Sequence, residues 1–283
     1  MDASGPNAEQ ITYWNEKTGP KWVREQARLD KMIAPFGAEA MAALAPRAGE
    51  QIIDVGCGCG ETSLELGRRV TASGGVHGVD ISQPMLARAR ERAAADGLAH
   101  VRFVPADAQT HAFTCDSADA IFSRFGVMFF SEPAVAFANL RQALRSNGRL
   151  AFVCWQTAPA NPWMAVPMMA AASVVPLKPP PPPGAPGPFA FGDRTRVESL
   201  LTQAGFRDVG LASFTPKVTV GGGGDLDATV DFVLQLGALS AVLEETPEAV
   251  ARVRAAVMEA LTPYVTVEGV VMESAAWIVT ARA

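Results

Sequence analysis

The sequence predicts an α/β protein built around a mostly parallel sheet. From residue 51 onward, short apolar runs alternate with amphipathic helical stretches, which is the pattern of β-α-β units. A glycine-rich turn, Asp54-Val55-Gly56-Cys57-Gly58-Cys59-Gly60, separates the first apolar run from the helix that follows it. Carboxylates follow or end three successive predicted strands, and the carboxyl ends of parallel strands share the sheet edge where ligands bind.

The predicted elements follow one another in a regular order. Residues 7–45 should be mainly helical, because apolar side chains recur there at helical spacing. The strands expected next span 52–55, 76–79, 101–104, 118–123 and 148–155. The helices expected between them span 62–71, 83–96 and 132–145. Asn147-Gly148 supplies a left-handed turn before the fifth strand.

After the fifth strand the alternation stops. Residues 156–190 are rich in proline and methionine, and five consecutive prolines at 179–183 predict an exposed polyproline-like connection. Beyond this segment we expect helices at 193–204, 226–243 and 247–261, strands at 208–214 and 270–280, and a flexible glycine tract at 221–224. The domain organisation expected is an N-terminal helical lid (1–45), a ligand-binding core (46–155), a cap insertion (156–190) and the remaining core sheet (191–283) with a helical insertion (225–262).

Composition excludes several classes of protein. The chain has 283 residues, a net charge of -5 and no long basic run, so it lacks the clustered cations that nucleic-acid binding requires. No signal peptide and no apolar stretch of about twenty residues is visible, which favours a cytoplasmic protein without a membrane span. The cysteines, Cys57, Cys59, Cys115 and Cys154, have the spacing of neither a disulfide framework nor a zinc site, so we expect no metal.

The carboxylates at the strand ends indicate a nucleotide-like ligand. Asp80 ends a predicted strand twenty residues after Gly60, where an acidic group accepts hydrogen bonds from both hydroxyls of a ribose. The alternative is that Asp80 caps the next helix, although Ser82 is better placed to do so. Asp107, in Pro105-Ala106-Asp107-Ala108, ends the third strand in the same way.

With these motifs the sequence resembles the class I S-adenosylmethionine-dependent methyltransferases from about residue 51 to residue 155. The glycine turn looks like the first motif of that family, the stretch 118–130 looks like its fourth motif, and 140–150 matches the lead into its fifth strand. Quinone-biosynthesis C-methyltransferases and small-molecule O- or N-methyltransferases are the most similar in pattern. The resemblance implies a Rossmann-like three-layer sandwich with a seven-stranded, mostly parallel sheet, an antiparallel last strand, and helical caps at the N-terminus and after the fifth strand.

The resemblance also implies roles for single residues. Backbone at Gly56 and Gly58 would lie along the methionine part of S-adenosylmethionine, and Asp80 would hold the ribose hydroxyls. Asp107 would accept from the adenine amino group with help from backbone at Ala108, and Ser123 would face the sulfonium. The full set of cofactor-binding residues implied is Asp54, Gly56, Cys57, Gly58, Gly60, Asp80, Ile81, Met85, Asp107, Ala108 and Ser123.

Apolar and aromatic residues near the same edge predict a small, largely hydrophobic or aromatic acceptor. The residues expected to bind it are Trp14, Phe125, Met128, Trp155 and Met164. Methionine adapts to irregular ligands, but core packing is the alternative for such a cluster. An oligomer, such as a homodimer, is left open by the sequence.

Candidate catalytic residues are few, because methyl transfer depends mainly on proximity and orientation and needs a base only when the acceptor must lose a proton. Tyr13, His111 and Arg124 are the candidates. Their alternatives are an aromatic packing role for Tyr13, a surface-loop position for His111 and an ordinary ion pair for Arg124.

Two other functions stay open on the sequence alone. A module that binds S-adenosylmethionine or S-adenosylhomocysteine without transfer is one, because no general base stands out. A nicotinamide-dependent oxidoreductase is the other, since its glycine turn and ribose acid look alike. Tyr13 and Lys17 even have the Y-x-x-x-K spacing of short-chain dehydrogenases, but they precede the glycine turn rather than follow it.

Overall fold

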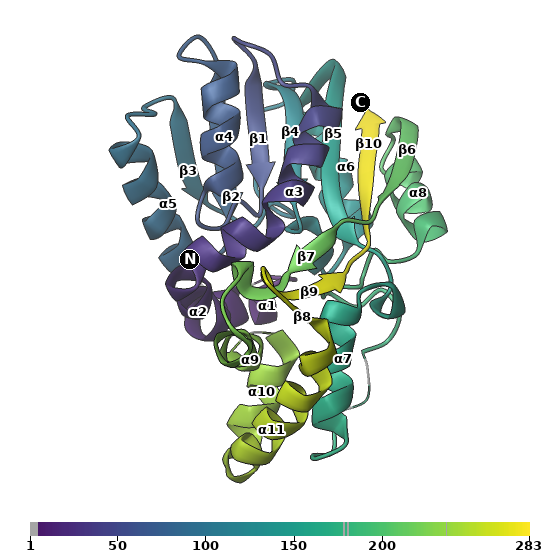
Figure 1. The fold of residues 1–283 in the computed structure, drawn as a ribbon. Coiled ribbons are helices and arrows are strands. Elements are labelled where there is room, and N and C mark those ends of the chain that lie inside the picture. Colours follow the sequence, from purple (N-terminus) through teal and green to yellow (C-terminus); the bar gives the residue numbers. More distant parts are fainter. Residues whose placement is uncertain (1–4, 178, 180, 236) are drawn as a thin grey trace.

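The computed structural model, which describes residues 5–177, 179, 181–235 and 237–283, is centred on a seven-stranded sheet (Figure 1). The strand order is β3-β2-β1-β4-β5-β10-β6. The strands are β1 (Gln51–Val55), β2 (Gly75–Asp80), β3 (Val101–Pro105), β4 (Ala118–Arg124), β5 (Leu144–Trp155), β6 (Arg207–Phe214) and β10 (Ala276–Arg282). Neighbouring strands among β1 to β5 pair in parallel, and β10 pairs antiparallel with both β5 and β6. The predicted architecture is therefore confirmed.

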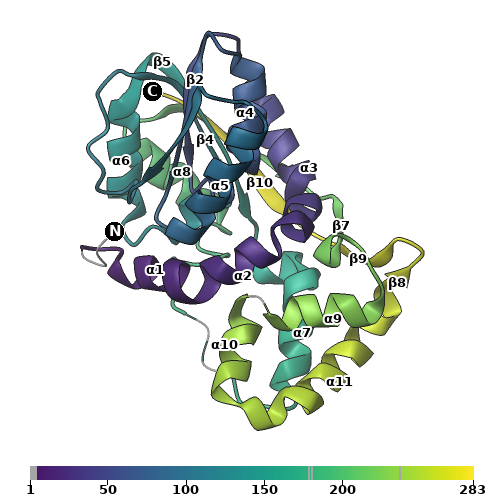
Figure 2. The ribbon, with the colours of Figure 1, turned by 90° about the vertical axis from the view of Figure 1, so that its left-hand side faces the viewer.

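Helices cover both faces of this sheet, which makes the three layers (Figure 2). One face carries α3 (Gln26–Leu44), α4 (Glu61–Val70) and α5 (Gln83–Ala95), and the other carries α6 (Pro133–Ala143) and α8 (Arg194–Gln203). Because both faces are covered, the central strands are apolar almost throughout, as in the run from Leu150 to Trp155 of β5, which is buried. Asn147 adopts the expected left-handed conformation, with φ of 64°.

The N-terminal segment is helical, as predicted, and crosses the carboxyl edge of the sheet. It consists of α1 (Ala8–Thr12), a π-helical turn η1 (Tyr13–Lys17) and α2 (Thr18–Arg24). In Figure 2 these elements lie between the sheet and the cap helix α10 (Gly237–Glu245). The segment is thus placed over the strand ends that carry the acidic residues.

The cap lies beyond the same edge and differs from expectation in three respects. It contains α7 (Pro162–Ala172), α9 (Leu226–Gln235), α10, α11 (Val250–Leu261) and a small sheet of β7 (Lys217–Thr219), β9 (Gly269–Glu273) and β8 (Val265–Thr266). The resemblance implied a helical cap after the fifth strand, but the position of α7 was not predicted, because the prolines of 156–190 suggested an irregular connection. Pro162 stands at the start of α7, where a missing N–H is tolerated.

In the other two differences, a predicted helix and a predicted strand are each interrupted at a point that the apolar pattern does not reveal. The helix expected at 226–243 is two helices, α9 and α10, and Gly237 at the start of α10 has a positive φ of 59°. The strand expected at 270–280 is also two, β9 and β10, which belong to different sheets. Asn161 holds the link between them, because its side chain donates to Ala275 O at 2.9 Å and accepts from Ala275 N at 3.0 Å.

Short turns and connections complete the chain. The 3₁₀ turns are η2 (Val127–Phe129), η3 (Ala158–Ala160), η4 (Val220–Gly222), η5 (Pro247–Ala249) and η6 (Thr262–Tyr264). In the predicted polyproline connection, Pro179 and the prolines at 181–183 are exposed, whereas residues 178 and 180 lie outside the described residues. Across the described residues no single helix is long and apolar enough to cross a membrane, although the bent pair Leu226–Gln235 and Leu239–Glu245 passes that test by length and composition.

Candidate functional site

The glycine turn between β1 and α4 wraps tightly around the carboxyl end of β2. Gly56, Gly58 and Gly60 all have positive φ, between 55° and 85°, which L side chains adopt only under strain. Gly56 N donates to Val79 O at 2.8 Å. A Cβ on Gly56 would lie 2.6 Å from Gly126 Cα, so the turn after β1 touches the turn after β4 at this point. The glycines of the motif are therefore required by close backbone contact.

Asp80 at the end of β2 joins this turn to the next helix. Its Oδ2 accepts from Gly58 N and its Oδ1 accepts from Ser82 N, both at 2.8 Å. Desolvation raises the pKa of the Asp80 carboxyl, while these backbone donors act in the opposite direction. Because a carboxylate can accept about four hydrogen bonds, each oxygen retains capacity for a further donor.

Asp54 lies beneath the turn and is fully buried. Its Oδ2 accepts from Thr62 Oγ1 at 2.7 Å and from Ser63 Oγ at 2.6 Å, and its Oδ1 has no hydrogen-bond partner among the described residues. Burial raises the pKa of Asp54 from 3.8 to about 6, although the two hydroxyl donors lower it. This carboxyl thus holds the start of α4 against β1.

Asp107 follows β3 and is enclosed by a polar cluster that the sequence did not predict. Its Oδ1 accepts from Gln109 N at 2.9 Å, and its Oδ2 accepts from the Asn7 side-chain amide at 2.8 Å. The exposed fractions of Asn7 and Gln109 are only 4% and 3%. The only signals in the sequence were two polar residues, Gln109 two positions after Asp107 and Asn7 just before the first helix.

Three more contacts fasten the N-terminal helices to the loop after β2. Asn15 donates to Ile81 O at 2.9 Å and accepts from Gln83 N at 2.9 Å. Ser82 Oγ donates to Trp14 O at 2.8 Å. A Cβ on Gly19 would lie 2.1 Å from Trp14 O and 2.5 Å from Ser82 Oγ, so this packing has no room for a larger residue. The segment therefore sits directly against the loops of both Asp80 and Asp107.

The remaining residues implied by the resemblance lie around these loops. Cys57, Met85 and Ala108 are buried, and the Met85 methyl would lie 2.9 Å from a Cβ on Gly58. Ser123 is fully buried, donates to Val55 O at 2.7 Å and accepts from Gly126 N at 3.2 Å. Its hydroxyl thus links the turn after β1 to the turn after β4 by hydrogen bonds. The sequence did not predict this structural role for Ser123.

Aromatic side chains gather at the carboxyl ends of β4 and β5. Phe125 stacks on Trp155 with ring centroids 4.0 Å apart and an interplanar angle of 14°. Phe36 of α3 packs edge-on against both rings, and Trp163 of α7 packs against Trp155 at 5.3 Å. Phe125 has a φ of 62°, a strained backbone conformation for an aromatic residue. Phe36 was not singled out from the sequence.

The other predicted acceptor residues are spread over the lid, the turn after β4 and the cap. Trp14 packs edge-on against Phe129 at 5.2 Å and Trp22 at 5.6 Å. Met128 is buried, and Met164 on α7 is half-buried against the hydrophobic core. These residues line the same edge from different elements.

Two of the three catalytic candidates lie apart from each other. Tyr13 lines a surface pocket of about 410 Å³ with Ala8, Glu9, Thr12 and Lys17. His111 follows Asp107 and packs edge-on against Phe113 at 4.6 Å. Neither has a hydrogen bond to a second catalytic candidate among the described residues.

Arg124, the third candidate, is engaged in an ion-pair network. It pairs with Asp30 of α3 at 3.1 Å, and Asp30 also pairs with Arg92 of α5 at 3.0 Å. Arg92 in turn contacts Glu61 at the start of α4. The ordinary ion pair weighed as the alternative for Arg124 is therefore present, and it links four elements around the site.

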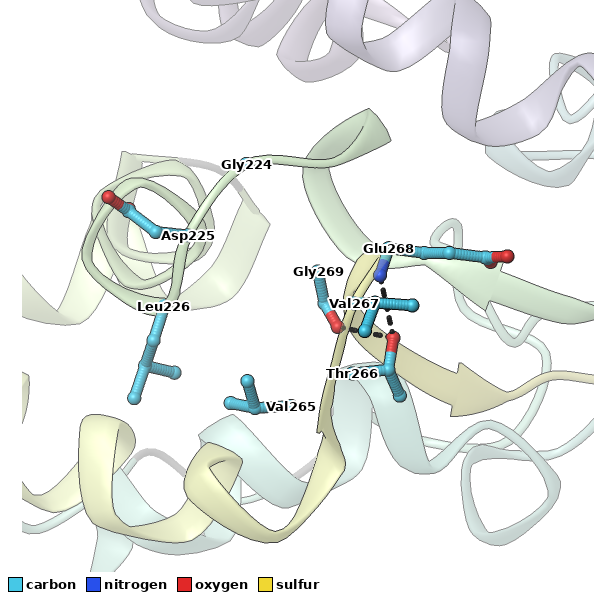
Figure 3. A pocket seen from close by; sticks show the side chains of 8 residues that line it. All are labelled: Gly224, Asp225, Leu226, Val265, Thr266, Val267, Glu268 and Gly269. Carbon is cyan, nitrogen blue, oxygen red and sulfur yellow. Dashed lines mark hydrogen bonds between the residues drawn. The ribbon is translucent and has the colours of Figure 1, made fainter.

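No group of metal ligands was found in the part of the chain that the structure describes. All four thiols are free, and burial raises the pKa of Cys59 to about 12, so the cysteines of the turn are poor nucleophiles. A second pocket, of about 400 Å³, lies on the β8–β9 hairpin and the start of α9 (Figure 3). Its lining contains none of the predicted site residues, and its hydrogen bonds, from Glu268 N to Thr266 Oγ1 and from Thr266 Oγ1 to Gly269 O, only close the hairpin.

Comparison with known proteins supports a single family. A methyltransferase-domain family model matches residues 52–148. Aklanonic acid methyltransferase of a Streptomyces species is 31% identical over 122 residues, which are 43% of this chain and 56% of that protein. Nocamycin O-methyltransferase of Saccharothrix syringae is 30% identical over 192 residues, which are 63% of this chain and 67% of that protein.

Among solved structures, phosphoethanolamine N-methyltransferase 2 of Haemonchus contortus in complex with S-adenosyl-L-methionine shares the fold. Its TM-score is 0.54 at 16% identity, and the match covers 87% of this chain and 51% of that one. The matched family model, the two curated relatives and the glycine turn with its strand-end carboxylates agree. The chain belongs to the class I S-adenosylmethionine-dependent methyltransferases.

Proposed function

We propose that this protein transfers the methyl group of S-adenosylmethionine to a small, largely hydrophobic or aromatic acceptor. The observation that carries the proposal is the arrangement of Asp80, Asp107 and the Gly56–Gly126 contact along one sheet edge. The relatives named for aklanonic acid and for nocamycin support a small-molecule acceptor.

The residues present fit the cofactor of the family. The glycine turn has no side chain at Gly58, where a Cβ would collide with the methyl of Met85, and the carboxylates of Asp80 and Asp107 keep unused acceptor capacity. Asp80 would accept from the ribose hydroxyls, Asp107 from the adenine amino group, and Ile81 and Met85 would flank the adenine ring. When bound, S-adenosylmethionine supplies an electrophilic methyl group.

The chain itself contributes position and exclusion of water. The turns after β1 and β4 would set the methyl group against the aromatic residues Phe125 and Trp155, and in-line geometry of this kind lowers a barrier by about 7 to 11 kcal/mol. The aromatic residues would orient a planar acceptor. Tyr13 and His111 stay predictions for a proton acceptor, and the cap and lid would enclose the reacting groups.

The organisation of the enzyme is part of the same proposal. Residues 1–45 would act as a lid, 46–155 as the cofactor-binding core, 156–190 and 225–262 as the acceptor cap, and the rest as core sheet. We place the enzyme in the cytoplasm. We also propose no nucleic-acid partner, because the net charge of the chain is negative. Light scattering distinguishes a monomer from a homodimer.

Calorimetry with S-adenosylmethionine, S-adenosylhomocysteine and NAD tests the ligand. We expect the first two to bind and NAD not to bind, and the reverse pattern would indicate an oxidoreductase. A screen of small aromatic acceptors with a radiolabelled methyl donor then tests transfer. Binding without transfer to any acceptor in a broad screen would favour the non-catalytic module.

Replacing Asp80 tests the ribose assignment. We expect Asp80→Ala to weaken S-adenosylhomocysteine binding by about tenfold or more, because hydrogen bonds to a charged group are lost. Asp80→Asn is the matched control, since it can still accept from Gly58 N and should lose less affinity. Unchanged affinity in Asp80→Ala, measured by calorimetry, would contradict the assignment.

A further inference from the structure

The N-terminal helix α1 reaches the nucleoside end of the candidate site through Asn7. The Asn7 amide nitrogen donates to Asp107 Oδ2 at 2.8 Å and to Gln109 Oε1 at 3.1 Å, while its oxygen accepts from Ser131 N at 2.9 Å. The cluster is almost completely buried, with 4% of Asn7 and 9% of Asp107 exposed. A buried network of this kind fixes the side-chain conformations of its members.

Within this cluster the Asp107 carboxylate keeps unused acceptor capacity. Asn7 uses both its amide hydrogens and its oxygen. Gln109 Oε1 accepts from Asn7, from Glu132 N at 3.1 Å and from Ser131 Oγ at 3.3 Å. The Asp107 carboxylate receives two donors among the described residues and has room for about four. The network therefore presents Asp107 as an acceptor held in one orientation.

A second buried acceptor lies on α1 itself, and Asn7 is the N-cap residue of that helix. Gln10 follows Asn7 by three residues, and side chains three apart are neighbours on a helix surface. Gln10 Oε1 is buried and has no hydrogen-bond partner among the described residues. A buried acceptor without a donor is unfavourable, so this oxygen indicates a ligand that brings an N–H or O–H group.

We propose that α1 forms one wall of the adenine pocket. Asn7 is a positioning residue that holds the Asp107 carboxylate so that it accepts one hydrogen of the adenine amino group. Gln10 Oε1 accepts the other hydrogen. The proposal rests on the proposed function, because it takes S-adenosylmethionine as the cofactor, and it makes the N-terminal segment a determinant of purine recognition.

The proposal predicts selection for an amino group at the purine 6-position. S-inosylhomocysteine is the probe, because it carries an oxo group there and would set an acceptor against Asp107 and Gln10. A site that binds a polar group through fixed partners strongly rejects an analogue without that group. We therefore expect wild type to bind S-adenosylhomocysteine at least about a hundredfold more tightly than S-inosylhomocysteine. Calorimetry with both ligands gives this ratio for each variant.

Asn7→Ala and Gln10→Met test the two roles. We expect each to weaken S-adenosylhomocysteine binding by about tenfold and S-inosylhomocysteine binding much less, so that the ratio falls. Gln10→Glu keeps an acceptor oxygen and should keep most of the ratio. Asn15→Ala is the matched control, because Asn15 also docks the lid but contacts Ile81 and Gln83 rather than Asp107. It should weaken both ligands equally.

The outcomes separate the proposal from its rivals. An equal loss for both ligands in Asn7→Ala, as in Asn15→Ala, would show that Asn7 only docks the lid and would overturn the proposal. Tighter binding of S-adenosylhomocysteine to Asn7→Ala would overturn it as well, because Asn7 would then compete with adenine for Asp107. If wild type binds S-adenosylhomocysteine and S-inosylhomocysteine equally well, only the proposal about α1 fails. If wild type binds neither ligand, the proposed function fails as well. Circular dichroism confirms that each variant is folded.

Discussion

Asp54 is the residue whose ionisation should govern stability most directly. It is fully buried beneath the glycine turn, and burial raises its pKa from 3.8 to about 6. The folded state therefore binds a proton more tightly than the unfolded chain does. The stability contributed by this proton is fully present below pH 4 and is lost as the pH rises through about 6.

The test compares wild type with Asp54→Asn in the absence of ligand. Asparagine still accepts from Thr62 and Ser63 but does not ionise, so the variant should lack this pH dependence. Between pH 4 and pH 7 we expect wild type to lose about 2 kcal/mol of unfolding free energy relative to the variant. Urea unfolding at several pH values measures the difference, and parallel curves for both proteins would refute the argument.

Asp30 and Arg124 form a largely buried pair, with side-chain exposures of 16% and 11%. Removing one partner leaves a charge poorly solvated, which costs about 3 kcal/mol for such pairs. Asp30→Asn should cost more than Arg124→Gln, because Asp30 also pairs with Arg92.

A double-mutant cycle on Asp30 and Arg124, read by urea unfolding, checks the ion-pair role. We expect the double variant to be more stable than the sum of the single changes predicts. Additive losses would mean that the pair is not coupled. The role of Arg124 toward an acceptor stays a prediction, and the acceptor KM of Arg124→Gln tests it.

Sequence reasoning succeeded best where a residue type is dictated by its immediate backbone. The glycines at 56, 58 and 60 and the carboxylates at 54, 80 and 107 could be found because tight turns and strand ends recur at fixed spacing. The partners of these residues could not be found, since Asn7 and Asp107 are joined only by tertiary packing.

Among the elements, the N-terminal lid (residues 1–45) packs most tightly against its neighbours at one glycine, Gly19. Gly19 in α2 lies so close to Trp14 O and Ser82 Oγ that any Cβ would force the segment away from the loop after β2. The π-helical turn at Tyr13–Lys17 places both Trp14 and Asn15 within hydrogen-bond distance of that loop.

Gly19→Ala should therefore loosen the lid while leaving the core sheet intact. We expect limited proteolysis to cut within the first 25 residues at least about tenfold faster, since cleavage follows local opening. Gly97→Ala is the control, because its Cβ would meet no atom within 4 Å and only its positive φ is strained. Equal protection of both variants would contradict the close packing.

The elements that the sequence failed to predict all lie in the cap. The resemblance implied helix in the cap after β5, but prolines hid the bounds of α7, and the β9–β10 break was hidden because both strands are apolar. From β1 to β6, by contrast, each strand of the core sheet and the helices α4, α5, α6 and α8 were predicted to within about two residues, apart from the start of β5, because regular alternation leaves few arrangements. The cap depends on long-range contacts such as that of Asn161 with Ala275, which no local pattern reports.

Across the protein, α1 and α2 lie at the carboxyl edge of the sheet, and the cap helices lie beyond them (Figure 2). In the proposed function, the N-terminal segment would cover the nucleoside and the cap would enclose the acceptor. A ligand that binds beneath the lid must wait for its contacts to break. We therefore expect the observed rate of S-adenosylhomocysteine binding in stopped-flow fluorescence to reach a plateau as ligand concentration rises. Asn15→Ala should raise that plateau several-fold, and a linear increase up to the diffusion limit would contradict gating.

Docking of the lid through Asn7, Asn15 and Ser82 also has a consequence for turnover. With the lid in its proposed role, the by-product nucleoside would leave by the same opening through which the methyl donor enters, so its departure would set the pace of each cycle when methyl transfer itself is fast. Good acceptors of different structure would then share one kcat and differ in KM. The first turnover would appear as a burst of methylated product, with the enzyme waiting afterwards for its lid to open.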